Sequence, residues 1–243
     1  LAPISRVRSL RRHPHWRVAL PIRARSIETM EPLTRLTSIV APLLRDNIDT
    51  DSIIPAAYMR SLSVAPASGL FARWRYRADG SENPQFVLND PRFRNARILL
   101  AGSNFGCGSS RENAVWALDG FGIRCVIALG FSDIFRENAF KNGVLPIELS
   151  KADHAPLAAS VTMGTLRVTI EVAARRIALP SGETLTFELD DRRQHNLLAG
   201  ADEVAQTLDR GAAIETFRAR HRARAPWLYA PADAEPVRNR DGH

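Results

Sequence analysis

The stretch that decides the fold is RILLAGSNFGCGSSRENAVWALDGF, residues 97–121. It starts with a short apolar run, Arg97–Ala101, of the kind that forms a buried strand. A loop with glycines follows at Gly102–Gly108. Ser109–Phe121 is then predicted to be a helix, with a serine at its start and Glu112 in its first turn. We therefore expect a strand, a tight turn and a helix in direct succession.

The same alternation continues to residue 149. Cys125–Leu129 is a second apolar run, Ser132–Asn142 is predicted to be a helix closed by Gly143 as its C-cap, and Leu145–Leu149 is a third strand. Strands that alternate with helices in this way form a parallel sheet with right-handed crossovers. The sequence therefore predicts an α/β fold.

The flanking segments are less regular. Ser38–Leu44 is predicted to be a strand, followed by a turn rich in Asp and Asn at residues 45–51. Residues 60–84 form a long segment of low regularity, which inside a compact domain is usually a functional loop or lid. After Lys151 we expect three strands and then two helices, at Thr165–Val172, Arg176–Leu179, Thr184–Leu189, Gln194–Leu208 and Ala212–Arg224.

Composition limits the classes of function. The chain has 243 residues, 45% of them hydrophobic and 24% charged, as in ordinary globular proteins. No apolar run approaches the ~18–20 residues that span a bilayer, so we expect no membrane segment. Two cysteines, Cys107 and Cys125, exclude a disulfide framework and a self-contained zinc or iron–sulfur site, because a cluster usually takes about three or four thiolates from its protein. We expect this chain to bind no metal.

The net charge of +7 is concentrated at the amino terminus. Residues 1–29 hold seven arginines against Glu28, which leaves 26 basic and 25 acidic residues for the rest of the chain. The near balance of the remainder does not support a basic face for nucleic acid. We expect three regions: an Arg-rich extension at 1–35 that is disordered or a leader, a domain at 36–210, and a carboxyl-terminal helix and tail at 211–243.

The loop before the first predicted helix is suited to binding an anion. The first N–H groups of a helix have no intrahelical partner and the helix dipole is positive there. Ser109, Ser110 and Arg111 add two hydroxyls and a guanidinium, which fit a planar carboxylate. The alternative is structural: a capped helix whose arginine pairs with a nearby acid. Cys107 in this loop is expected to be a small structural thiol.

Better-known motifs do not fit this loop. The dinucleotide-binding pattern needs a third glycine where Arg111 stands, and the phosphate-binding P-loop needs a lysine that is missing. The nucleophile elbow needs glycines on both sides of its serine at two-residue spacing, which Ser109 and Ser110 lack.

The loop resembles a known family. Asn104-Phe105-Gly106-Cys107-Gly108-Ser109-Ser110-Arg111-Glu112 is very similar to the signature of isopropylmalate isomerase small subunits, the detached swivelling domain of the aconitase family. Asn47-Ile48-Asp49-Thr50-Asp51-Ser52-Ile53-Ile54-Pro55 is similar to the amino-terminal motif of the same family. Three shorter matches follow in order and spacing: Phe86-Val87-Leu88-Asn89, Trp116-Ala117-Leu118 and Asp133-Ile134-Phe135.

The resemblance implies a fold, a site and a partner. The fold is a three-layer β/β/α swivelling domain with a long substrate loop. Ser109 matches the serine that takes the substrate proton, Ser110 and Arg111 match the carboxylate-binding positions, and Asp51 falls near the active-site rim. The resemblance places a [4Fe–4S] cluster in a separate large subunit, whose iron acts as Lewis acid on the substrate hydroxyl. The chain is thus expected to be a cytoplasmic hydro-lyase subunit of leucine biosynthesis, active only with that partner.

Some positions depart from the family pattern. The family usually has His after Arg-Glu, where this chain has Asn113. An Arg-Thr-Gly stretch is replaced in the region Val64–Leu70, and Arg60 is a candidate replacement for the lost guanidinium. Besides isopropylmalate, two alternatives follow: a diverged paralogue for a related diacid such as citraconate or maleate, or a non-catalytic carboxylate-binding module.

Overall fold

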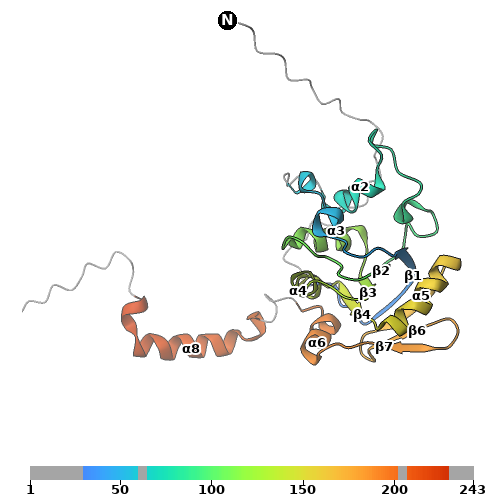
Figure 1. The fold of residues 1–243 in the computed structure, drawn as a ribbon. Helices are drawn as coiled ribbons and strands as arrows, with labels where there is room; N and C mark the ends of the chain where they lie inside the picture. Colours follow the sequence, from blue (N-terminus) through green and yellow to red (C-terminus); the bar gives the residue numbers. More distant parts are fainter. Residues whose placement is uncertain (1–29, 60–64, 202–206, 230–243) are drawn as a thin grey trace, which may run out of the picture.

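The computed structural model describes residues 30–59, 65–201 and 207–229. Its centre is a seven-stranded sheet in the order β4-β3-β2-β1-β5-β6-β7 (Figure 1). The strands are β1 Arg35–Leu43, β2 Ile98–Ala101, β3 Cys125–Ala128, β4 Leu145–Glu148, β5 Arg167–Glu171, β6 Arg176–Ala178 and β7 Thr184–Thr186. β1 to β4 are parallel, whereas β5 to β7 continue from β1 in antiparallel pairing.

Strand β1 belongs to both halves of the sheet. Its first part, Arg35–Ile39, pairs antiparallel with β5, and its last part, Val40–Leu43, pairs parallel with β2. Its side chains alternate between two cores, with Leu36 and Val40 in one and Ala41 and Leu43 in the other. This alternation is the period-2 pattern of a strand with both faces covered.

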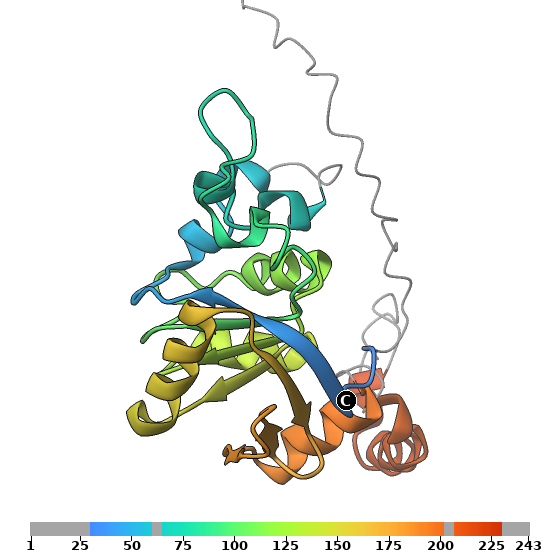
Figure 2. The same cartoon turned by 90° about the vertical axis from the view of Figure 1, so that its right-hand side faces the viewer.

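Helices cover the two faces of the parallel half. These helices are α3 Glu112–Phe121, α4 Asp133–Lys141, α5 Lys151–Met163 and α6 Asp191–Ala199; a further long helix, α8 Gly211–Arg224, lies apart from the sheet (Figure 1). Residues of α3 and α4 share the first core with segment 48–96, whereas α5, α6 and the antiparallel strands share the second (Figures 1 and 2). The layers are helices, parallel strands and antiparallel strands, which is the β/β/α arrangement expected from the sequence.

The long segment between β1 and β2 contains only short helices. They are α1 Thr50–Ile53, η1 Ala56–Tyr58, η2 Pro66–Gly69, α2 Ala72–Arg75 and η3 Val87–Asn89. Another short helix, η4 Pro226–Tyr229, follows α8. Arg75 is buried among them; its Nη1 donates to the carbonyl of Leu70 (3.3 Å), and its guanidinium lies 4.7 Å from the ring centre of Phe121. Residues 65–75 of the predicted loop are therefore packed onto α3, whereas residues 77–82 are exposed.

Three sequence-based expectations need correction. The helix predicted from Ser109 begins at Glu112, because residues 107–109 pair with residues 49–50 instead of turning. The sequence predicts a strand as the first element after Lys151, but α5 fills residues 151–163. Pro156 lies inside this helix, where proline is disfavoured, so the local pattern does not favour a helix. The predicted helix Gln194–Leu208 begins at Asp191 and ends at Ala199, with Gly200 as its C-cap; its residues 202–206 lie outside the described part.

Candidate functional site

Two loops run side by side beyond the ends of β1 and β2. Because these strands are parallel neighbours, their carboxyl ends lie at the same edge of the sheet. Three backbone hydrogen bonds extend the pairing into the loops: Asn47 N to Ser103 O (2.9 Å), Gly106 N to Ile48 O (2.7 Å) and Thr50 N to Cys107 O (2.9 Å). The two long motifs singled out in the sequence therefore form one unit.

Side chains fix the start of this unit. Asp46 accepts hydrogen bonds from the backbone N–H (2.6 Å) and the hydroxyl (2.8 Å) of Ser103, and these bonds lower the pKa of the Asp46 carboxyl. Asn104 Nδ2 donates to Asn47 Oδ1 (2.8 Å), and both asparagines have positive φ, which Asn tolerates better than most residues. The side chains of Asp46 and Asn47 thus hold the start of the loop that follows β2.

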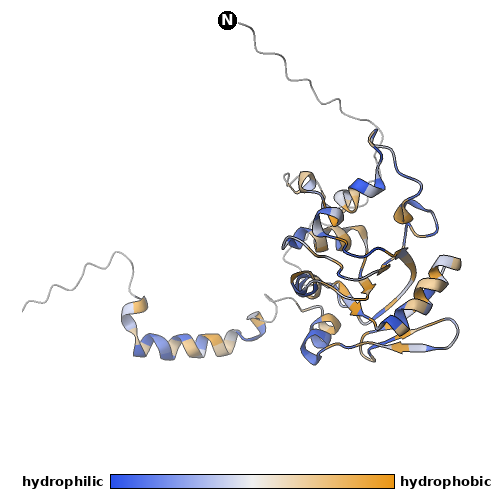
Figure 3. Ribbon diagram, in the orientation of Figure 1, coloured by the Kyte–Doolittle hydropathy of each residue, from blue (hydrophilic) through white to orange (hydrophobic). Residues whose placement is uncertain are grey.

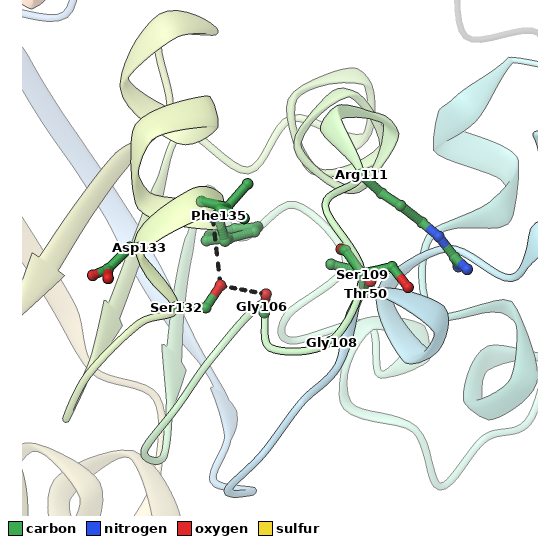
Figure 4. A pocket seen from close by; sticks show the side chains of 9 residues that line it. Thr50, Gly106, Gly108, Ser109, Arg111, Ser132, Asp133 and Phe135 are labelled. Atoms are coloured by element: carbon green, nitrogen blue, oxygen red, sulfur yellow. Dashed lines mark hydrogen bonds between the residues drawn. The ribbon is translucent and has the colours of Figure 1, made fainter.

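The second loop is also tied to the start of α4. Phe105 N donates to Gly130 O (2.9 Å), and the Ser132 hydroxyl donates to Gly106 O (2.6 Å) (Figure 4). Gly106 has φ +75°, and a Cβ there would collide with the ring of Phe135. A glycine is therefore required at this position both for the backbone angle and for the close approach of α4.

A pocket of about 200 Å³ lies between this loop and the first turn of α4. Its walls carry hydroxyls, one guanidinium, one carboxylate and two apolar side chains (Figure 4). The lining residues are Thr50, Gly106, Gly108, Ser109, Arg111, Ser132, Asp133, Ile134 and Phe135. Thr50 Oγ1 donates to the carbonyl of Ser109 (2.9 Å), which holds the Ser109 backbone at the edge of the pocket.

The structure brings together part of the predicted site. Ser109 and Arg111 line the pocket; Ser110 lies between them and is exposed. Asp51 is within α1, and its carboxylate pairs with Nη1 of Arg111. Arg60 lies outside the described residues. The structural alternative, an arginine paired with a nearby acid, is thus present, but α3 has no side-chain cap and the serines stay outside the helix.

The Arg111–Asp51 pair is stable around neutral pH. The hydrogen bond from Arg111 is the main cause that lowers the pKa of Asp51, with desolvation opposing it. A lowered carboxyl pKa contributes stability that is complete above the ordinary value of 3.8 and is lost as pH falls through the lowered value. The pair therefore orients Arg111 throughout the physiological range.

Sequence reasoning gave no role to the first turn of α4. Ser132 caps this helix, with its hydroxyl accepting from Phe135 N (3.4 Å), and Ile134 lines the pocket although 53% of its surface is exposed. The position of these residues directly after a predicted parallel strand could have indicated the role, because loops that follow parallel strands meet at one edge of the sheet and form sites there.

The end of α4 also anchors a motif residue. The Asn142 side-chain amide donates to Glu112 Oε1 (2.8 Å) and accepts from Trp116 Nε1 (3.0 Å). Glu112, which belongs to the quoted signature, therefore ties α3 to α4.

The described residues do not fit an iron–sulfur cluster. Among them, no three His, Cys, Asp or Glu side chains converge on a common point. Cys107 is partly exposed in the loop, whereas Cys125 is fully buried in β3, where desolvation raises the pKa of its thiol. Within the same ranges, no helix is long and apolar enough to cross a membrane.

The glycines of the loop allow a matched test. Gly106→Ala and Gly108→Ala both place alanine at positive φ, but only Gly106→Ala collides with the Phe135 ring. A Cβ at Gly108 would make ordinary contacts, with Asp49 Cβ at 3.5 Å and Thr50 Oγ1 at 3.8 Å. We expect Gly108→Ala to lower the free energy of unfolding by about 1–2 kcal/mol, and Gly106→Ala by clearly more. Chemical denaturation of both variants measures the difference. Equal losses would contradict the close packing of α4 on the loop.

Comparison with known proteins places this geometry in a family. The family model for the aconitase C-terminal domain matches residues 30–152, which contain both loops and the first turn of α4. The chain is similar to the crystal structure of 3-isopropylmalate dehydratase from Methanocaldococcus jannaschii, with a TM-score of 0.55 and 27% identity, over 75% of this chain and 98% of that one. The likeness confirms the expected fold class.

Curated relatives share more of the sequence. The 3-isopropylmalate dehydratase small subunit of Azorhizobium caulinodans is 48% identical over 201 residues, which cover 82% of this chain and 100% of the relative. The small subunit of the same name from Brucella anthropi is 47% identical over 200 residues, with the same shares covered. The chain therefore belongs to the family of 3-isopropylmalate dehydratase small subunits, within the wider family of aconitase C-terminal domains.

Proposed function

We propose that the chain is the small subunit of a hydro-lyase that dehydrates 2-isopropylmalate and rehydrates it to 3-isopropylmalate in leucine biosynthesis, together with a large subunit. The observation that carries the proposal is the pocket at which Ser109 and Arg111 meet. Both motifs shared with the family contribute to it, and its hydroxyls and guanidinium suit a small hydroxy diacid.

Arg111 is proposed to bind a substrate carboxylate. Its guanidinium has five N–H donors, of which Asp51 engages Nη1. Asp51 therefore orients the group and leaves donors for a ligand, so that Asp51 acts through Arg111. The exposed Ser110 adds a hydroxyl beside it. Arg60 stays a prediction from the sequence.

Ser109 is proposed to be the base that removes a proton from the substrate carbon. It stands at the pocket edge, its backbone is held by Thr50, and the positive charge of Arg111 in the same pocket favours an anionic oxygen there. An iron–sulfur cluster, proposed to reside in the large subunit, would supply the Lewis acid for the departing hydroxyl. This chain contributes the proton transfer and the carboxylate site.

Ile134 favours a substrate with an apolar branch. A side chain of this size is costly to leave exposed in water, and here it lines the pocket together with the ring of Phe135. The isopropyl group of isopropylmalate would cover it, and the smaller methyl group of citraconate would cover less. The cytoplasmic location expected from the sequence stays a prediction.

The first test is reconstitution with the candidate large subunit. The two chains are co-purified without oxygen and assayed by absorbance with isopropylmalate and with citraconate. We expect a complex with kcat/KM higher for isopropylmalate, since each extra buried methyl group contributes about 1 kcal/mol. Activity on citraconate alone would assign the chain to a diverged diacid dehydratase. Failure to form any complex would favour a non-catalytic binding module.

Ser109→Ala tests the proposed base. Loss of the group that takes the proton should lower kcat by about 100-fold or more while KM changes little. The complex should still assemble, because the Ser109 contact to Thr50 uses only the backbone. Ser160→Ala, at an exposed serine of α5, is the matched control. A kcat within a few-fold of the control would remove Ser109 from that role.

Arg111→Lys tests carboxylate binding. Lysine keeps the positive charge and a partner for Asp51, but it loses the planar two-pronged donor set. We expect KM to rise roughly 10- to 100-fold, the value of one or two charged hydrogen bonds. Steady-state kinetics of the reconstituted enzyme measure it. An unchanged KM would mean that Arg111 serves only to pair with Asp51.

A further inference from the structure

Helix α8 is mostly exposed, with Gly211, Ile214 and His221 half-buried. None of its residues is buried, in contrast to α3 to α6. Figure 1 shows it lying clear of the sheet, and Figure 3 shows apolar residues among its hydrophilic ones. Phe217 is 55% exposed, and Trp227 and Leu228 of η4 are 71% and 64% exposed. We call residues 211–229 the C-terminal arm.

The apolar residues of α8 form a narrow stripe. At 3.6 residues per turn, Ile214, Phe217 and His221 fall within about 60° of one another around the helix axis. The arginines lie on both sides of this stripe, as two i, i+4 pairs: Arg218 with Arg222, and Arg220 with Arg224. The remaining face is made mostly of alanines. The helix therefore presents an aromatic ridge between two cationic edges.

The arm is ordered by its own contacts. The chain turns at Ala225, which is buried, and η4 returns over the last turns of α8. Tyr229 OH lies 2.9 Å from His221 Nδ1, and the His221 ring stacks on Phe217 with 5.3 Å between centroids. Arg222 lies 5.0 Å from the ring centre of Tyr229. A surface that is fixed before binding loses less entropy when it docks.

This composition fits a protein groove best. Trp, Tyr and Arg are the residues that most often carry binding energy in protein interfaces. A phosphate backbone would require the arginines on one face, whereas here the apolar stripe separates them. A membrane surface would require a wide apolar face, and this stripe is narrow and contains a histidine. The charge of the arm, four arginines against Glu215, requires a partner with acidic edges.

We propose that the C-terminal arm docks on the large subunit, in a groove with an apolar floor and acidic rims on both sides. This proposal rests on the proposed function, because that function is what implies a large subunit. The arm is then a tether outside the active site: it sets the affinity between the subunits and leaves the chemistry at Ser109 unchanged.

The test compares full-length variants with the purified large subunit. Phe217→Ala combined with Trp227→Ala removes the two most exposed aromatic side chains of the arm, and Arg218→Glu combined with Arg222→Glu reverses the charge of one edge. Ala219→Ser, on the small face, is the matched control. We expect each double variant to raise the Kd of the complex about 30-fold or more, as loss of an interface anchor does, and kcat at saturating large subunit to stay unchanged.

The outcomes separate the two proposals. Unchanged Kd for both double variants would overturn the docking role, even if the enzyme is fully active. The variants could instead weaken self-association, vesicle binding or RNA binding while the Kd for the large subunit stays unchanged. That result would overturn the proposal and assign the arm to the partner whose binding is weakened. If the complex forms only with an intact arm but shows no activity on isopropylmalate, the docking role of the arm would be supported and the proposed function would be overturned.

Discussion

The site depends on the parallel pairing of β1 with β2. The register that joins Val40 to Ile98 brings the two strands to an end together, and hydrogen bonds carry the pairing into both loops as far as Thr50 and Cys107. Thr50 thereby reaches Ser109, and Asp51 reaches Arg111, although about sixty residues separate the partners in sequence. A slip of one residue would turn alternate side chains to the opposite face and separate these partners.

Much of the fold could be predicted from local patterns. The buried strands at 98–101, 125–128 and 145–148 are short apolar runs between turn residues, and Ser132 and Gly143 mark the ends of α4 where helix caps are expected. Helix α5 is less evident in the sequence because Pro156 lies inside it, although Ser150 caps it and His154, Leu157 and Val161 follow helical spacing. A proline beyond the first turn counts against a helix in sequence, but packing can compensate.

The site was harder to predict than the fold. The residues near Ser109 were visible in one continuous motif, but the contact between Asp51 and Arg111 depends on strand register, which local sequence does not encode. The start of α3 was misplaced for the same reason: the serines favour a helix cap locally, and pairing with residues 49–50 holds the loop in another conformation. Tertiary pairing thus determines which donors remain available to a ligand.

The two edges of the sheet affect how copies of the chain meet. At one edge stands β4, four residues long and interrupted by Pro146, which has no N–H to donate; at the other stands β7, three residues long. Short edge strands and edge prolines prevent strand-by-strand addition of a neighbour. Sheets of separate molecules are therefore poor templates for one another, which protects a crowded cell from fibrous aggregates of this chain.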